Sequence, residues 1–131
     1  MTVPRLSKRV AAAKLSPPVA RTFADGLQSV IEQAPGEQPT KQRLITRLVG
    51  TLGAGVEAAP FEALWPHAEL FLTACIYVAV TDGRYGVEEA RHVSQLAHRL
   101  GLSARQLEQL EARVFGELQV RGRGAGVPAA G

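Results

Sequence analysis

Cysteine is almost absent from the sequence: Cys75 is the only one, and it lies inside an apolar segment. A single cysteine cannot form an internal disulfide, and it excludes zinc and redox sites built on paired cysteines. Among apolar neighbours a free thiol packs as a small hydrophobic side chain, so we expect Cys75 in the core. A chain of 131 residues, 46% of them hydrophobic, is long enough to bury that core as one domain without a disulfide or a metal.

Long hydrophobic runs are also missing. The longest strongly apolar run, Leu70 to Val80, has only about half of the ~20 residues that a membrane-spanning helix needs. The N-terminus carries Arg5, Lys8, Arg9 and Lys14, but no continuous apolar stretch follows them as in a secretory signal. We therefore expect a cytoplasmic protein with no transmembrane segment.

Enzyme motifs are absent as well. Neither H-E-x-x-H nor G-x-S-x-G occurs, and the G-A-G at 53–55 is too short to cradle a phosphate. The histidines, His67, His92 and His98, lie in three separate contexts, and the last two face different sides of a helix because they are six residues apart. We expect no enzymatic activity and no cofactor.

Charge is distributed unevenly along the chain. The formal net charge is +3, yet all twelve acidic residues lie between Asp25 and Glu117 with only eight lysines and arginines, which leaves this body at −4. The remaining seven basic residues lie toward the two ends: Arg5, Lys8, Arg9, Lys14, Arg21, Arg121 and Arg123. These basic flanks are either solvated tails or a site of peripheral contact with phosphate or an anionic lipid surface.

Apolar residues recur at spacings of three and four along the whole chain, which predicts helices and no strands. The expected helices run from Pro17 to Ala34, from Thr40 to Leu52, from Pro60 or Pro66 to Val80, from Val87 to Leu100, and from Ser103 to Leu118. The segment from Phe71 to Val80 is apolar on nearly every side, which is typical of a helix surrounded by other helices.

Helix ends carry their own signals. Gly101 is placed as the glycine that closes one helix in the left-handed conformation, and Ser103 with Gln106 predicts a capping box for the next. We expect Trp65 and Tyr77 in the core. The other inward positions are Val19, Phe23, Leu27, Val30, Ile31 and Ala34; Leu44, Ile45, Leu48, Val49 and Leu52; Val87, Ala90, Val93, Leu96, Ala97 and Leu100; and Leu107, Leu110, Val114 and Leu118.

Three parts of the chain are expected. Residues 1–16 form a basic N-terminal arm that can adopt a short helix through Leu6, Val10 and Ala13, although it is too short to hold one alone. Residues 17–119 form the helical domain. Residues 120–131 are rich in glycine and poor in apolar residues, which predicts a disordered tail.

The Asp-Gly turn at 82–83 invites comparison with known loops. Together with Glu89 it matches the second half of an EF-hand, but Val78 and Val80 occupy the first two ligand positions and offer no side-chain oxygen. A calcium loop of this type is excluded. The other Asp-Gly, at 25–26, falls inside a predicted helix and indicates an exposed acid beside a small packing residue.

Residues Val93 to Val114 can also be interpreted as a helix-turn-helix. The sequence S-Q-L-A-H-R-L-G-L-S-A-R-Q-L-E-Q-L resembles the first DNA-binding half of AraC-type regulators. In this alternative Arg105 and Gln106 stand where base edges would be read. The helix that would enter the groove has two arginines against three glutamates, which opposes binding to phosphates. We therefore keep DNA binding as the alternative and expect nucleic acid not to be the partner.

A longer segment, roughly residues 61–118, has a second resemblance. An apolar helix ending in A-V-T-D-G-R at 79–84, then E-E-A-R at 88–91 and L-G-L-S at 100–103, resembles the TerB-like family. These are all-helical bacterial domains of tellurite-resistance proteins and of the N-terminus of DjlA co-chaperones. The resemblance covers roughly residues 61–118. It implies an all-α, single-domain bundle of five or six helices that acts as a non-catalytic adaptor, in some cases associated with stress.

The resemblance also implies an acidic patch, of which this chain has half. Residues 52–62 contain no second Asp-Gly turn. Asp82, Glu88 and Glu89 alone are too few ligands for tight metal binding, so we expect no metal, and first-turn glutamates are in any case favoured by the helix dipole. We expect the turn to contact another protein or a second copy of the chain through Asp82, Arg84, Tyr85, Glu88 and Glu89.

Overall fold

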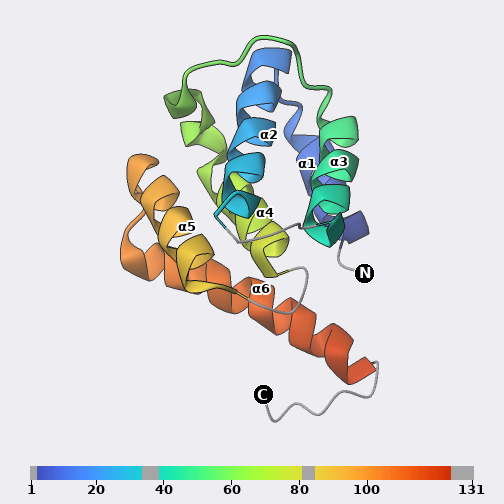
Figure 1. Ribbon diagram of the computed structural model, residues 1–131, viewed down its shortest axis with the longest axis vertical. Helices are drawn as coiled ribbons and strands as arrows, with labels where there is room; N and C mark the ends of the chain where they lie inside the picture. Colours follow the sequence, from blue (N-terminus) through green and yellow to red (C-terminus); the bar gives the residue numbers. More distant parts are fainter. Residues whose placement is uncertain (1–2, 34–38, 81–84, 125–131) are drawn as a thin grey trace.

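The computed structural model describes residues 3–33, 39–80 and 85–124 (Figure 1). Within these ranges it contains six α-helices, one 3-10 segment and no strand, which confirms the expected all-α bundle. The elements in chain order are α1 (Val3–Ala13), α2 (Pro17–Ile31), α3 (Pro39–Leu52), η1 (Phe61–His67), α4 (Ala68–Val80), α5 (Val87–Arg99) and α6 (Ala104–Gly124).

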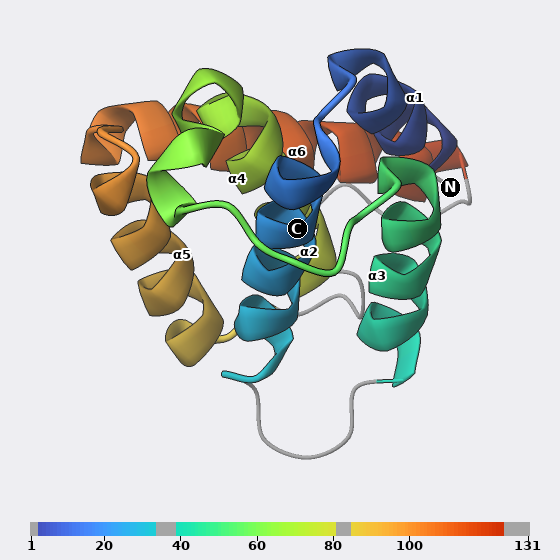
Figure 2. The same ribbon diagram turned by 90° about the horizontal axis from the view of Figure 1, so that it is seen from above.

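Helix α4 is the centre of the core. Every residue from Phe71 to Val80 is buried, and all five other helices and η1 pack against α4 (Figure 2). Such a position requires a helix that is apolar all round, as the sequence predicted. Cys75 is fully buried there, and burial raises the pKa of its thiol, so it stays protonated and unreactive.

Helices α2 and α4 approach closely at Gly26. A Cβ at this position would lie 2.4 Å from the Phe71 ring, so only glycine fits under that ring. Phe71 also contacts Phe23 and Phe61 edge to face, with ring centroids 5.2 and 5.9 Å apart. On the solvent side, Asp25 is exposed and pairs with a neighbouring arginine. The expected exposed acid beside a small packing residue is confirmed.

Helix α1 belongs to the core although it lies in the basic N-terminal segment. Leu6 and Val10 are 1 and 2% exposed, and α1 packs against α3 and α4. Helical structure was expected here only as a short helix of an arm. At the other end, α6 continues to Gly124, past the expected domain end at residue 119. Residues 125–131 of the expected tail lie outside the described residues.

The corner between α5 and α6 is closed by both predicted end signals. Gly101 has φ +80°, its N–H donates to His98 O, and the N–H of Leu102 donates to Ala97 O, which is the six-residue closure favoured by glycine. Ser103 Oγ accepts the N–H of Gln106 at 3.1 Å, and the Gln106 side-chain oxygen accepts the N–H of Ser103 at 2.8 Å. Both predictions are confirmed.

Most predicted inward positions are buried, but two are wrong. Val87 is 71% exposed because it is the first residue of α5, and Trp65 is 59% exposed because it lies in η1, outside the continuous apolar stripe of α4. Tyr77 is buried as expected. Three positions, Val19, Val49 and Ala90, are half-buried, and Ala34 and Leu118 lie outside the described side chains.

Candidate functional site

The structure separates the residues predicted to contact a partner. Asp82 and Arg84 lie outside the described residues. Glu88 and Glu89 fall in the first turn of α5, and Tyr85 lies just before that helix. These three neighbours in sequence have three different environments, so the described part of the turn is not one continuous contact surface.

Glu89 is buried, which corrects its expected place on the surface. Its Oε2 lies 2.5 Å from Nζ of Lys41, and the two side chains are 4 and 2% exposed. Its other oxygen accepts the N–H of Gly86 at 3.3 Å, at the start of α5. A carboxylate taken out of water needs such partners, and the pair ties α3 to α5 across 48 residues of sequence. Glu89 therefore supports the fold.

Lys41 was not singled out by the sequence reasoning, although a signal was present. It lies three, four and seven residues before Leu44, Ile45 and Leu48, on the same buried stripe of α3. A lysine on an apolar stripe is rarely buried without an acidic partner. That spacing would have indicated a buried cation, although it could not indicate Glu89 as its partner.

Tyr85 is half-buried and joins the start of α5 to α6. Its hydroxyl donates to Oε2 of Glu111 at 2.8 Å, and its ring meets Phe115 edge to face with centroids 5.8 Å apart. Burial and the hydrogen bond to the carboxylate raise the pKa of this hydroxyl, because both oppose its ionisation. The side chain expected to anchor a partner thus contacts the chain's own helix.

The Tyr85→Phe variant tests this contact. We expect the free energy of unfolding to fall by about 1 kcal/mol at pH 7, because one hydrogen bond is lost while the aromatic contact remains. The raised pKa predicts that wild type loses this advantage as the pH rises above about 10, where the unfolded tyrosine ionises. Urea titrations at pH 7 and at high pH measure both effects. Equal stability of the two proteins at pH 7 would contradict the assignment.

Glu88 is on the surface. Its side chain is 63% exposed and lies 3.9 Å from Arg91, at the limit of an ion pair and worth little in water. Glu57, in the segment 52–62 that lacks a second Asp-Gly turn, is exposed in the loop before η1. That loop leads through η1 to the start of α4 (Figure 1), whereas Glu88 lies in α5, which follows the end of α4. Among the described residues no three histidine, cysteine or acidic side chains gather as a metal site.

A hollow of about 490 Å³ lies at the corner where the start of α4 meets the α5–α6 turn. Trp65, the only tryptophan, is 59% exposed at this hollow. Its ring rests on Gly101, where a Cβ would come within 2.5 Å of the indole. The closing glycine of α5 therefore also makes the seat of the exposed tryptophan. The hollow is lined by residues 65–70, residues 100–102 and Gln106.

The neighbourhood of the hollow is held by charged and aromatic contacts. The guanidinium of Arg99 lies 4.1 Å from the centroid of the Phe61 ring and 3.7 Å from Oε2 of Glu62. The ring contact is a cation–π interaction, and it connects the last turn of α5 to η1. The segment that carries Trp65 is thereby fixed to α5 on one side and, through Phe61 and Phe71, to α4 on the other.

The residues of the DNA-binding alternative are exposed at the start of α6. Arg105 and Gln106 both face solvent, but the Gln106 oxygen is already used in the capping box with Ser103. Adenine is read by glutamine through its oxygen and its nitrogen together. Such readout would require the cap to open, and this weighs against the alternative.

The histidines make no catalytic arrangement with one another in the described chain. His92 Nε2 lies 2.9 Å from Oγ of Ser29, whose hydroxyl lies 2.6 Å from the Gly26 carbonyl oxygen. Burial lowers the pKa of His92, so its neutral form is favoured in the folded protein. His67 is half-buried beside the hollow, and His98 is exposed.

Comparison of the chain with protein-family models, with curated proteins and with solved structures finds no match. Among the described residues one segment, Phe61–Val80, is long and apolar enough to cross a membrane, but 67% of its most apolar window is buried inside the bundle. That is what the core helix of a helical bundle requires.

Proposed function

We propose that the protein is a non-catalytic protein-interaction module of the TerB-like type, and that its partner binds at Trp65. The observation that carries this proposal is the exposed tryptophan beside a hollow of about 490 Å³. Tryptophan is the side chain most enriched at interface positions that dominate binding energy, particularly where it adjoins a pocket.

The partner is a protein segment that inserts an apolar side chain into the hollow. Leu70, Leu100 and Leu102 supply an apolar lining, while Glu69 and Gln106 supply polar groups at the same place. Such a mixture of apolar and polar side chains is the composition of a non-obligate protein–protein contact. The rigid seat of Trp65 on Gly101 lowers the entropy cost of binding, because the ring does not need to be ordered by the partner.

The proposed contact surface at Trp65 is not the one expected from the sequence, which was the turn at 82–89. Glu89 and Tyr85 have internal partners, so their side chains serve the fold. Glu88 remains available in the first turn of α5. The corner at Trp65 lies at the opposite end of α5, beyond Arg99.

Substitution of Trp65 tests the proposed site. The purified 131-residue chain is used to capture partners from extracts of its source cells, and these partners are identified. Each purified partner is then titrated against the wild-type chain and against Trp65→Ala. We expect the variant to bind about thirtyfold more weakly, as for an interface position worth 2 kcal/mol or more. The melting temperature should remain close to wild type because most of the indole is already in water.

Val87→Ala is the matched control. It removes an exposed apolar side chain from the opposite end of α5, where Val87 is 71% exposed. We expect no change in affinity from this variant. If Trp65→Ala binds the purified partner as tightly as wild type, or if Val87→Ala loses as much affinity, the site is elsewhere. If the captured partner is a second copy, the mass in solution should halve in Trp65→Ala only.

A further inference from the structure

Nearly half of the lysines and arginines of the chain lie in or next to two helices that pack together. Helices α1 and α3, with Lys14 between α1 and α2, contain seven lysines and arginines and no acidic residue: Arg5, Lys8, Arg9, Lys14, Lys41, Arg43 and Arg47. Since the net charge of the whole chain is +3, the rest of it carries −4. The basic N-terminal end seen along the sequence is thus joined in space by basic residues of α3 from the body of the chain.

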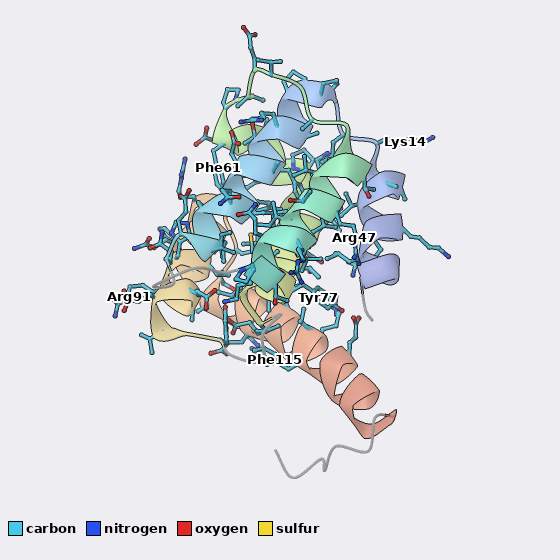
Figure 3. The ribbon with its side chains drawn as sticks, turned by 45° about the vertical axis from the view of Figure 1, so that its right-hand side comes forward. Lys14, Arg47, Phe61, Tyr77, Arg91 and Phe115 are labelled. Carbon is cyan, nitrogen blue, oxygen red and sulfur yellow. The ribbon has the colours of Figure 1, made fainter. Side chains whose placement is uncertain are left out.

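These two helices lie side by side although 25 residues, 14–38, separate them in the sequence (Figure 3). Lys14 and Arg47 are on this side of the molecule, and Arg91 is on the opposite side (Figure 3). Lys41 is buried with Glu89 and does not contribute to the surface. The described side chains that do contribute are Lys8, Arg9, Lys14, Arg43 and Arg47, which we call the basic face; four are exposed and Arg9 is half-buried.

The basic face lacks the apolar groups that would insert into an anionic lipid bilayer and the aromatic groups that would stack on single-stranded nucleic acid. The large exposed apolar side chains of the described chain are Val56, Trp65 and Val87, none of which is on α1 or α3, so nothing on the face inserts into a bilayer. Neither helix contains an aromatic residue, so there is no platform on which single-stranded bases could stack. Beside its cations the face exposes Thr40, whereas the side chains of Gln42 and Thr46 hydrogen-bond to Gln28 and to the Gln42 carbonyl oxygen.

From this combination we infer that the basic face binds duplex nucleic acid through its phosphate backbone. Lysine and arginine side chains neutralise phosphates, release counterions and donate hydrogen bonds to phosphate oxygens. No acid on α1 or α3 opposes this contact. The inference is independent of the helix-turn-helix alternative, which would use α6, and of the protein partner at Trp65, which lies on other elements.

The test is a titration of the 131-residue chain into a fluorescently labelled 20-base-pair DNA duplex at several salt concentrations. Each phosphate contact contributes about −0.9 to the slope of the logarithm of affinity against the logarithm of salt concentration. We expect Arg43→Gln/Arg47→Gln to reduce that slope by about two and to weaken binding equally for duplexes of unrelated sequence.

The control Arg91→Gln/Arg113→Gln removes the same number of exposed arginines from α5 and α6. We expect it to keep the wild-type slope. Equal losses in the two double variants would show attraction to net charge alone and would overturn the inference. So would the absence of duplex binding at low salt, tighter binding to a single strand of the same length, or binding of phosphatidylserine vesicles without binding of the duplex.

Discussion

Replacement of Lys41 by methionine is expected to lower the free energy of unfolding by about 3–5 kcal/mol, a large part of the 5–15 kcal/mol typical of a domain. The variant fills similar space but leaves Glu89 buried without its cation, at a carboxylate only 4% exposed. Urea denaturation followed by circular dichroism at 222 nm measures the effect. Removal of the charge, rather than of volume, causes the loss.

Two further variants show whether the loss of stability comes from the broken Lys41–Glu89 ion pair or would follow any substitution. Lys41→Met/Glu89→Leu should recover most of the stability, because the carboxylate that Lys41 leaves unpaired is removed with it. Arg91→Met breaks the exposed pair with Glu88 and should cost less than about 0.5 kcal/mol. A loss below 1 kcal/mol in Lys41→Met would mean that water reaches the pair, and the buried cross-link between α3 and α5 would be wrong.

Gly26→Ala should destabilise the protein by about 1–3 kcal/mol although alanine is the better helix former. The added methyl would lie 2.4 Å from Cζ of Phe71, and that ring is already held by Phe23 and Phe61. Helices α2 and α4 must therefore separate, or the aromatic cluster must repack. Thermal and urea unfolding both report the loss.

Gly50→Ala is the matched control for this substitution. Gly50 is also inside a helix, but apart from its chain neighbours and the nearby backbone of α3 no atom lies within 4 Å of the position of its added Cβ. We expect this variant to be up to about 1 kcal/mol more stable than wild type, since only the backbone propensity changes. If both alanine variants are stabilised, Gly26 is not a contact point between α2 and α4.

The sequence was sufficient where one local rule decides the structure. The apolar run from Phe71 to Val80 has no polar face, so a central helix is its only satisfactory place. Gly101 and Ser103 are followed by residues that complete their caps, and the hydrogen bonds depend on neighbours within a few residues. These features could be predicted because their partners are close in sequence.

The candidate site could not be predicted in the same way because its partners are distant in sequence. Glu89 was expected on the surface as a first-turn acid, but its surroundings depend on Lys41, which lies on another helix. Trp65 was expected in the core as a large aromatic residue, but the core at that end is filled by Leu64 and Phe71, with Phe61 packed at its edge. Which aromatic side chain fills the core and which stays outside depends on the packing of η1 on α4.

The basic face, too, could not be predicted from the sequence, because it depends on packing between helices that are distant in sequence. The sequence indicated basic ends, and the packing of α1 on α3 joins one of those ends to Arg43 and Arg47 from the body of the chain. Arg21, counted with the basic end, instead pairs with Asp25 on the exposed side of α2. A contact between helices far apart in sequence therefore created the basic face.

The fluorescence emission of Trp65 on addition of the purified partner is the most direct test of whether the partner binds at this side chain. Trp65 is the only tryptophan and is 59% exposed, so in a partner without tryptophan its emission is the whole signal and starts near that of indole in water. Insertion of an apolar side chain beside it should shift the emission maximum to shorter wavelength, saturating at one partner per chain. An unchanged emission maximum at a saturating concentration of the partner would show that Trp65 stays in water and would contradict binding at Trp65.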